Sequence, residues 1–167
     1  MIATAVCLAI RLLPPPFRAP NVEPIMATMM PFAKAKGALA GALFAFISMV
    51  LLDLVQGRVG MWTLVTAVTY GVLGACAPLY FARLSGVRGY VSYAVLATLV
   101  FDGVTGVLMG PLLFGQTFTS AFVGQIPFTV LHLLGNMALA LTISSVIEVW
   151  LVHGFATSRI KLATSAA

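Results

Sequence analysis

Charge is what this chain has least of. Only 8% of its 167 residues are Asp, Glu, Lys or Arg, whereas 61% are hydrophobic, and the mean hydropathy is +1.09. A soluble domain needs many more charged side chains to cover its surface, so this composition excludes one. The composition predicts an all-α integral membrane protein, because helices satisfy their backbone hydrogen bonds inside lipid.

Short motifs for catalysis and nucleotide binding are also missing. The chain contains no G-x-x-x-x-G-K-[ST], no H-E-x-x-H and no G-x-S-x-G, which excludes ATP hydrolysis by a P-loop and two common hydrolase designs. Its two cysteines, Cys7 and Cys76, stand singly in apolar segments and are interpreted as buried hydrophobic side chains. We therefore expect no catalytic residues, no metal site and no cofactor.

Long apolar segments make up most of what is present. The first charged residue is Arg11, and no basic region or small-residue cleavage site typical of a signal peptide precedes the apolar start. We interpret residues 1–13 as a short first helix, which is tilted inward or begins upstream of this sequence. The whole chain, 1–167, then forms a single domain of six transmembrane helices, at about 1–13, 22–34, 37–55, 62–82, 89–108 and 122–152.

The few basic residues predict the orientation of these helices. Six of them fall on one side of the predicted topology and three on the other. Because cytoplasmic loops are enriched in Lys and Arg, both termini are predicted to lie in the cytoplasm of a multi-pass plasma-membrane protein. The larger group is Lys34, Lys36, Arg83, Arg88, Arg159 and Lys161, and the smaller group is Arg11, Arg18 and Arg58.

Polar residues recur at helical spacing in the fourth, fifth and sixth segments. On the sixth, Gln125, Thr129, His132 and Asn136 fall within about 60° of arc on one face. Such groups need partners in a bilayer, so they either join neighbouring helices or line a cavity. For His132 and Asn136 we favour the cavity. The predicted substrate pocket consists of Trp62, Thr66, Tyr70, Asp102, Gln125, Thr129, His132 and Asn136.

Several short runs, taken in order, resemble one family: the substrate-binding S components of energy-coupling factor (ECF) transporters. The runs that carry the resemblance are Arg11–Pro14, Pro20–Pro24, Gly37 to Gly41, Asp53–Gly57, Gly60–Thr63, Gly124–Phe128 and His132–Asn136. The short first helix departs from the family pattern.

The resemblance implies a six-helix protein that captures a vitamin or related micronutrient from outside. Such proteins deliver it through a shared transmembrane T component and two cytoplasmic ATPases. In this family an Ala-x-x-x-Ala motif of the first helix contacts the T component, and Ala5 and Ala9 match it. The pocket is expected in the outer half, closed by outer loops that include residues 110–120.

Two other functions stay open at this point. A membrane-embedded enzyme could use His132 and Asp102 for acid–base chemistry, and a stand-alone secondary carrier or ion channel could bind cations at Asp53 and Asp102. Nothing in the sequence points to nucleic acid. The identity of the small-molecule substrate is open, as is the role of the two aspartates, which could cap helices instead of binding a ligand.

Overall fold

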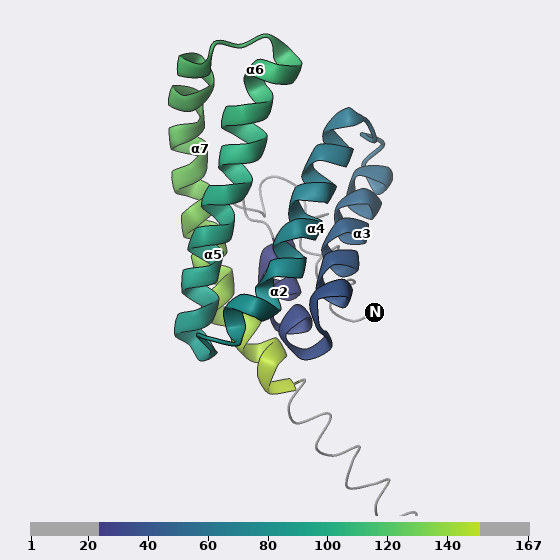
Figure 1. Cartoon of the computed structure of the whole chain (residues 1–167), viewed down its shortest axis with the longest axis vertical. Helices are drawn as coiled ribbons and strands as arrows, with labels where there is room; N and C mark the ends of the chain where they lie inside the picture. Colours follow the sequence, from purple (N-terminus) through teal and green to yellow (C-terminus); the bar gives the residue numbers. More distant parts are fainter. Residues whose placement is uncertain (1–23, 151–167) are drawn as a thin grey trace, which may run out of the picture.

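The computed structural model describes residues 24–150, and that part of the chain is helical apart from short connections (Figure 1). Two segments, η2 and η3, are π-helical, and the last helix continues through residues 145–150. The elements are α2 (Pro24–Lys36), α3 (Ala38–Val55), α4 (Met61–Phe81), α5 (Gly86–Asp102), η2 (Gly103–Leu108), α6 (Met109–Phe114), α7 (Phe118–Leu139) and η3 (Ala140–Ser144).

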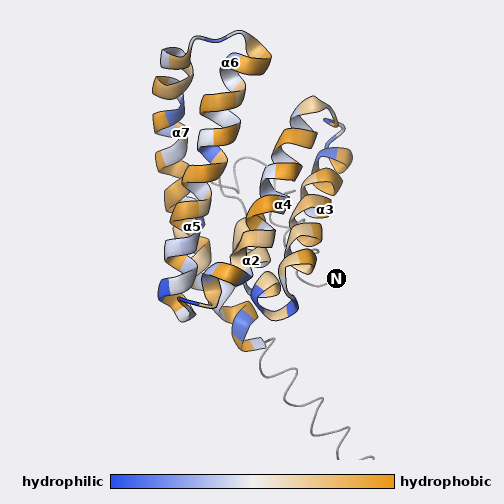
Figure 2. Cartoon of the chain, viewed as in Figure 1, coloured by the Kyte–Doolittle hydropathy of each residue, from blue (hydrophilic) through white to orange (hydrophobic). Residues whose placement is uncertain are grey.

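Four helices are long and apolar enough to cross a membrane, which indicates a membrane-embedded protein. They are Ala38–Val55, Met61–Phe81, Gly86–Phe114 and Phe118–Trp150. Most residues of these helices are hydrophobic (Figure 2), and many of their large hydrophobic side chains are exposed, as expected for surfaces in contact with lipid. The remaining helix, α2, has 13 residues and is about 20 Å long, less than the ~30 Å hydrocarbon core.

The helices form two antiparallel pairs that share α2. One pair is α3 with α4, and the other is the long α5–η2–α6 helix with α7 (Figure 1). Helix α2 contacts α3 and α4 on one side and α5, α7 and η3 on the other. Its side chains Ile25, Met26, Met29 and Met30 are fully buried, so α2 forms the centre of the hydrophobic core.

The α3–α4 pair is held at close range by two glycines. A Cβ atom added at Gly41 would lie 2.5 Å from the Gly74 carbonyl oxygen and 2.5 Å from the Ala33 Cβ, and one added at Gly74 would overlap the Gly41 carbonyl. The backbones therefore pack directly against each other, which small residues at helical spacing permit in membranes.

The predicted helix boundaries hold for the middle of the chain and fail in the second half. The fifth helix does not end near residue 108, because η2 and α6 extend it to Phe114. The predicted loop of residues 110–120 is therefore wrong, and only residues 115–117 connect the two helices. Pro111 is typical of a helix stop, but it lies inside this continuous helix, directly after the π-helical segment η2.

Part of the prediction lies outside the described residues. This applies to the first helix at 1–13, to the loop that follows it, and to Ala5 and Ala9. The prediction of six spans thus stays a prediction. Cys76 lies within the described residues and is exposed, so the expectation that it is buried is wrong.

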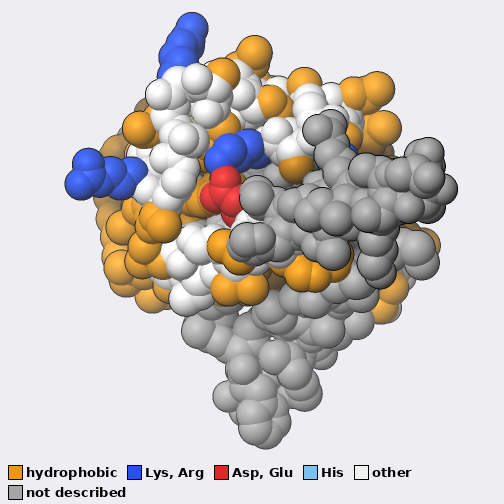
Figure 3. Space-filling view, turned by 90° about the horizontal axis from the view of Figure 1, so that it is seen from below, with side chains coloured by type: hydrophobic (Ala, Val, Ile, Leu, Met, Phe, Trp, Pro, Cys, Tyr) orange, Lys and Arg blue, Asp and Glu red, His pale blue; other side chains and the backbone are white. Residues whose placement is uncertain are grey.

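The two ends of the bundle differ in charge. Figure 3 views the lower end, where basic side chains surround an acidic one. Lys34 and Lys36 occupy the last turn of α2, and Arg83 and Arg88 flank the α4–α5 connection at the same end. The Lys34 ammonium pairs with Glu148 and lies 5.5 Å from the centre of the Tyr90 ring. Arg58 lies in the α3–α4 connection at the opposite end.

Candidate functional site

The polar face predicted on the last helix points into the protein. His132 and Asn136 are each 1% exposed, and Gln125 and Thr129 are partly buried, whereas Val130, Leu131 and Leu134 between them are exposed. The matching side chains of the preceding helix, Thr98, Asp102 and Thr105, are buried as well. The sequence could predict that both sets of residues face inward, because the residues that share one face of a helix follow from their spacing along the chain.

Two hydrogen bonds join these stripes. His132 Nδ1 lies 2.8 Å from Asp102 Oδ1, and Asn136 Nδ2 donates to Thr98 Oγ1 at 2.8 Å. We call Thr98, Asp102, His132 and Asn136 the α5–α7 seam. Both bonds lie between helices, so these groups do join neighbouring helices, which is one of the two roles considered for them.

The seam also contains polar atoms that take no part in these two hydrogen bonds. Asp102 Oδ2, His132 Nε2 and Asn136 Oδ1 are buried and have no hydrogen-bond partner among the residues of the described range. The His132 ring is enclosed by aromatic edges, with the Phe101 and Phe128 ring centres 5.8 and 5.6 Å away. A buried polar atom without a partner costs about 1–3 kcal/mol, so three on one seam mark it as more than a packing contact.

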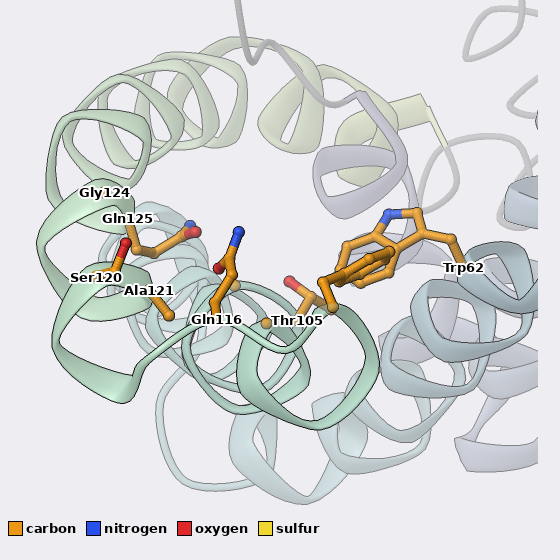
Figure 4. Close-up of a pocket in the computed structure, with 10 residues that line it drawn as sticks. Trp62, Thr105, Gln116, Ser120, Ala121, Gly124 and Gln125 are labelled. Carbon is orange, nitrogen blue, oxygen red and sulfur yellow. The ribbon is translucent and has the colours of Figure 1, made fainter.

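A pocket of about 420 Å³ lies at the end of the bundle that carries the α3–α4 and α6–α7 connections (Figure 4). Its volume falls within the range of small-molecule sites, and no charged side chain from residues 24–150 lines it. The lining residues are Trp62, Thr105, Gly106, Gly110, Phe114, Gln116, Ser120, Ala121, Gly124 and Gln125.

Trp62 closes this pocket on the α4 side. Its ring centre lies 5.7 Å from that of Phe114, and the two rings are inclined by 57°. Figure 4 shows Trp62 across the pocket from Gln116, Ser120 and Gln125, which come from the α6–α7 half. The pocket thus has an aromatic wall and an opposite wall of amide and hydroxyl groups.

Gln125 also lines a second, smaller cavity of about 250 Å³, which opens on the outer surface between α5 and α7, where Leu99 and Phe122 are exposed. It lines both cavities, and Asp102 and Thr129 line the second one. Its amide lies over Gly106, where an added Cβ would overlap it, and its Nε2 lies 3.4 Å from Thr129 Oγ1. Gln125 lies within α7, which begins at Phe118 and carries Pro127 in its interior.

The structure divides the eight predicted pocket residues. Trp62 and Gln125 line the larger pocket, and Thr129 and Asp102 line the smaller cavity with Gln125. The other four, Thr66, Tyr70, His132 and Asn136, are buried away from both, and Thr66 Oγ1 donates within its own helix to Trp62 O at 3.0 Å.

Tyr70 instead packs against the α5 helix. Its ring centre lies 4.5 Å from that of Phe101, which also contacts the His132 ring. Tyr70 is therefore a neighbour of the seam and does not line the pocket.

Sequence reasoning missed Gln116, Ser120, Gly106 and Gly110 as pocket residues. Three of them lie in residues 110–120, which the sequence predicts to be a loop. The signal that could have found them is the run of small and amide residues continuing the inward face past residue 108.

Two wide turns keep the inward faces aligned over long helices. In η2 the π-helical turn brings Thr105 and Gly110, both buried, closer to one face than α-helical spacing would. In η3 it keeps Ser144 inward, where its hydroxyl donates to Ala27 O at 2.7 Å.

Asp53 has a different role from Asp102, although the surrounding sequences resemble each other. Its Oδ2 accepts from Thr63 Oγ1 at 2.7 Å, and its backbone oxygen accepts from Arg58 N at 2.9 Å. Both bonds fasten the α3–α4 connection. The similar sequences around Asp53 and Asp102 therefore do not form two equivalent sites.

Comparisons with known protein families, characterised proteins and solved structures found no match. The fold and the site define an all-helical protein with four potential membrane spans and a pocket at one end.

Proposed function

We propose that this protein is the substrate-capture subunit of an ATP-driven importer of the ECF type, binding a vitamin or related micronutrient. The observation that carries the proposal is the 420 Å³ pocket between α4 and the α6–α7 hairpin, at the end opposite the basic residues Lys34, Lys36, Arg83 and Arg88. By the positive-inside rule, that end faces outward.

The arrangement fits capture of a small molecule with a flat ring. Trp62 and Phe114 supply aromatic faces, and the amides of Gln116 and Gln125 supply donors and acceptors on the opposite wall. Aromatic surface with a few convergent polar groups is the usual composition of a small-molecule site. The chain has no P-loop motif, so the energy for transport would come from partner ATPases.

The direct test is to purify the protein in mild detergent and identify the small molecule that it retains by mass spectrometry. We expect one heteroaromatic compound at close to one copy per protein. A second purification from Trp62→Ala and Gln125→Ala variants should retain much less of it. If well-folded wild-type protein never retains a ligand and binds none when supplied with cell extract, the capture function is wrong.

Trp62 also provides an optical test, because the chain has only two tryptophans, Trp62 and Trp150. Replacing Trp150, which is 57% exposed, by Phe leaves Trp62 as the single tryptophan. Addition of the retained compound should change the emission of this variant in proportion to occupancy. The same titration of a Trp62→Phe variant that keeps Trp150 should show no change, and a response there would contradict binding at this pocket.

The predicted partners have a test of their own. If Ala5 and Ala9 contact the T component, Ala5→Trp or Ala9→Trp should block co-purification with that component and the two ATPases while leaving ligand binding intact. Unchanged co-purification would remove the interface assignment without touching the pocket.

One observation favours a second function, a membrane-embedded acid–base enzyme. Asp102 and His132 form a buried hydrogen-bonded pair, an arrangement that can move a proton. Release of the retained compound in chemically altered form, by purified protein without any ATPase, would support the enzyme over the capture subunit.

A further inference from the structure

The 420 Å³ pocket has a floor of small residues and a rim of larger ones. Thr105, Gly110 and Ala121 are buried at the floor, whereas Trp62 and Gln116 are exposed at the rim. Of the lining residues that the structure describes, Thr105 is the one buried residue with a polar side chain, and it is 4% exposed. A ligand that reaches the floor therefore meets the Thr105 hydroxyl.

This hydroxyl presents an acceptor to the pocket. Its proton is used within the helix, because Thr105 Oγ1 donates to Phe101 O at 2.8 Å. A hydroxyl oxygen has two lone pairs, so Oγ1 can still accept a hydrogen bond from a ligand. Figure 4 shows the Thr105 hydroxyl between Gln116 and the Trp62 ring. The floor therefore matches a ligand group that carries an N–H.

Gln116 presents a donor on the same wall. A Cβ added at Gly110 would lie 2.7 Å from Gln116 Oε1, so the amide oxygen rests against the bare backbone of this glycine. The amide nitrogen, which only donates, is turned away from the oxygen and toward the open space of the pocket (Figure 4). Thr105 and Gly110 are separated by one wide turn, because the π-helical segment η2 repeats every five residues. The acceptor and the donor are therefore neighbours.

We infer that the ligand carries an amide edge, a carbonyl next to an N–H as in a lactam or a carboxamide, which Thr105 and Gln116 bind together. The inference rests on the proposed capture function and specifies the chemistry of its substrate. The ligand N–H donates to Thr105 Oγ1, its carbonyl accepts from Gln116 Nε2, and its ring lies against Trp62. Such an edge is neutral and suits a pocket that no charged side chain of residues 24–150 lines.

The probes for the test are 2-pyridone and 1-methyl-2-pyridone, which share one ring and one carbonyl and differ by an N–H against an N–CH₃. Their binding to the purified full-length protein in detergent is measured by saturation-transfer NMR titration. We expect 2-pyridone to bind about fivefold more tightly, the usual worth of one hydrogen bond, although the methyl group of the other probe adds apolar surface.

Thr105→Val keeps the branched side chain and removes the acceptor. The preference for 2-pyridone should then fall below about twofold, because neither probe finds a partner for an N–H at the floor. Thr69→Val is the matched control, since Thr69 Oγ1 also donates to a backbone oxygen four residues earlier, that of Val65, at 2.7 Å, and Thr69 lines neither cavity. Its preference should equal that of wild type.

Gln116→Leu tests the donor separately. Both probes keep the carbonyl, so both should bind about fivefold more weakly while the ratio between them stays that of wild type. Gln116 is an exposed residue of the α6–α7 connection, and its replacement leaves the helices intact. This variant therefore decides the inference even if Thr105→Val does not fold.

The outcomes separate this inference from the capture function. Equal binding of the two probes, tighter binding of 1-methyl-2-pyridone, no binding of either, an unchanged preference in folded Thr105→Val, or unchanged affinities in Gln116→Leu would each overturn the inference. The capture function is decided by the ligand retained on purification. A retained compound without a carbonyl next to an N–H would therefore disprove the amide edge and leave the capture subunit standing.

Discussion

At the scale of single residues, the contact between Asp102 and His132 decides most about the site. Asp102 is 1% exposed in the interior of an apolar bundle, and its Oδ1 lies 2.8 Å from His132 Nδ1. A buried charge is tolerated when a partner of matched geometry satisfies it, and loss of that partner is expensive. The same two side chains therefore hold α5 and α7 together and supply polar groups of the seam.

This coupling gives a stability prediction. His132→Ala should lower the free energy of unfolding by about 3 kcal/mol, because the Asp102 carboxylate remains buried without its donor. The double variant His132→Phe with Asp102→Leu removes both polar groups and should be less destabilised than His132→Ala. Thermal unfolding of the purified proteins in the same detergent, followed by circular dichroism, measures both. A double variant less stable than the single one would show that the pair is net stabilising.

At the scale of elements, two glycines let the backbones of α3 and α4 approach more closely than any residue with a side chain would allow. The carbonyl oxygens of Gly41 and Gly74 each occupy the place where the other residue would carry a Cβ. Backbone atoms cannot move aside as a flexible side chain can, so any side chain here separates the helices. The contact makes α3 and α4 one rigid pair against which Trp62 is positioned.

Gly41→Ala and Gly74→Ala should each destabilise the protein by about 1–3 kcal/mol, which is the usual cost of overpacking. Gly124→Ala is the matched control, because a Cβ at that helical position meets nothing within 4 Å and should leave stability the same or slightly higher. Thermal unfolding in detergent compares the three. Equal effects at Gly41 and Gly124 would refute the close approach.

The helices also show how far sequence reasoning reaches. The inward faces of α5 and α7 could be predicted from Thr98, Asp102, His132 and Asn136, because apolar and polar residues alternate with the helical period along each segment. The partners of these residues could not be predicted, since the register between two helices depends on packing over their whole length. The pairing of Asp102 with His132 therefore appears only in the structure.

The pocket was predicted less well for a different reason. Gly110 and Pro111 are typical of a helix end, and the wide turn at Gly103–Leu108 that lets the helix continue has no clear sequence signal. Gln116 and Ser120 were consequently placed in a loop instead of the pocket wall. Thr66 and Tyr70, which were predicted to line the pocket, are buried and line neither the pocket nor the smaller cavity.

At the scale of the whole molecule, the bundle has two unlike ends. The pocket and Arg58 lie at one end, and Lys34, Lys36, Arg83 and Arg88 lie at the other. The ion pair of Lys34 with Glu148 joins the end of α2 to the last helix at the basic end. If that end is cytoplasmic, as the charge distribution predicts, a ligand reaches the pocket from outside the cell.

Chemical labelling of intact cells tests this orientation. In a background with Cys7→Ala and Cys76→Ala, Val59→Cys places a thiol at an exposed position of the α3–α4 connection, and Ser85→Cys places one at the α4–α5 connection. A membrane-impermeant maleimide should label the first in intact cells and the second only after the membrane is permeabilised. The reverse pattern would invert the topology and turn the pocket toward the cytoplasm.

The wide turn at Ala140–Ser144 also determines how this chain tolerates a change in length. Deletion of one residue within this turn would convert its i→i+5 hydrogen bonding into the i→i+4 pattern of a regular α-helix, so the helix after it would face the same way as before. Glu148 would therefore still reach Lys34. In relatives of this protein, a helix one residue shorter at Ala140–Ser144 should keep the ion pair between these two positions.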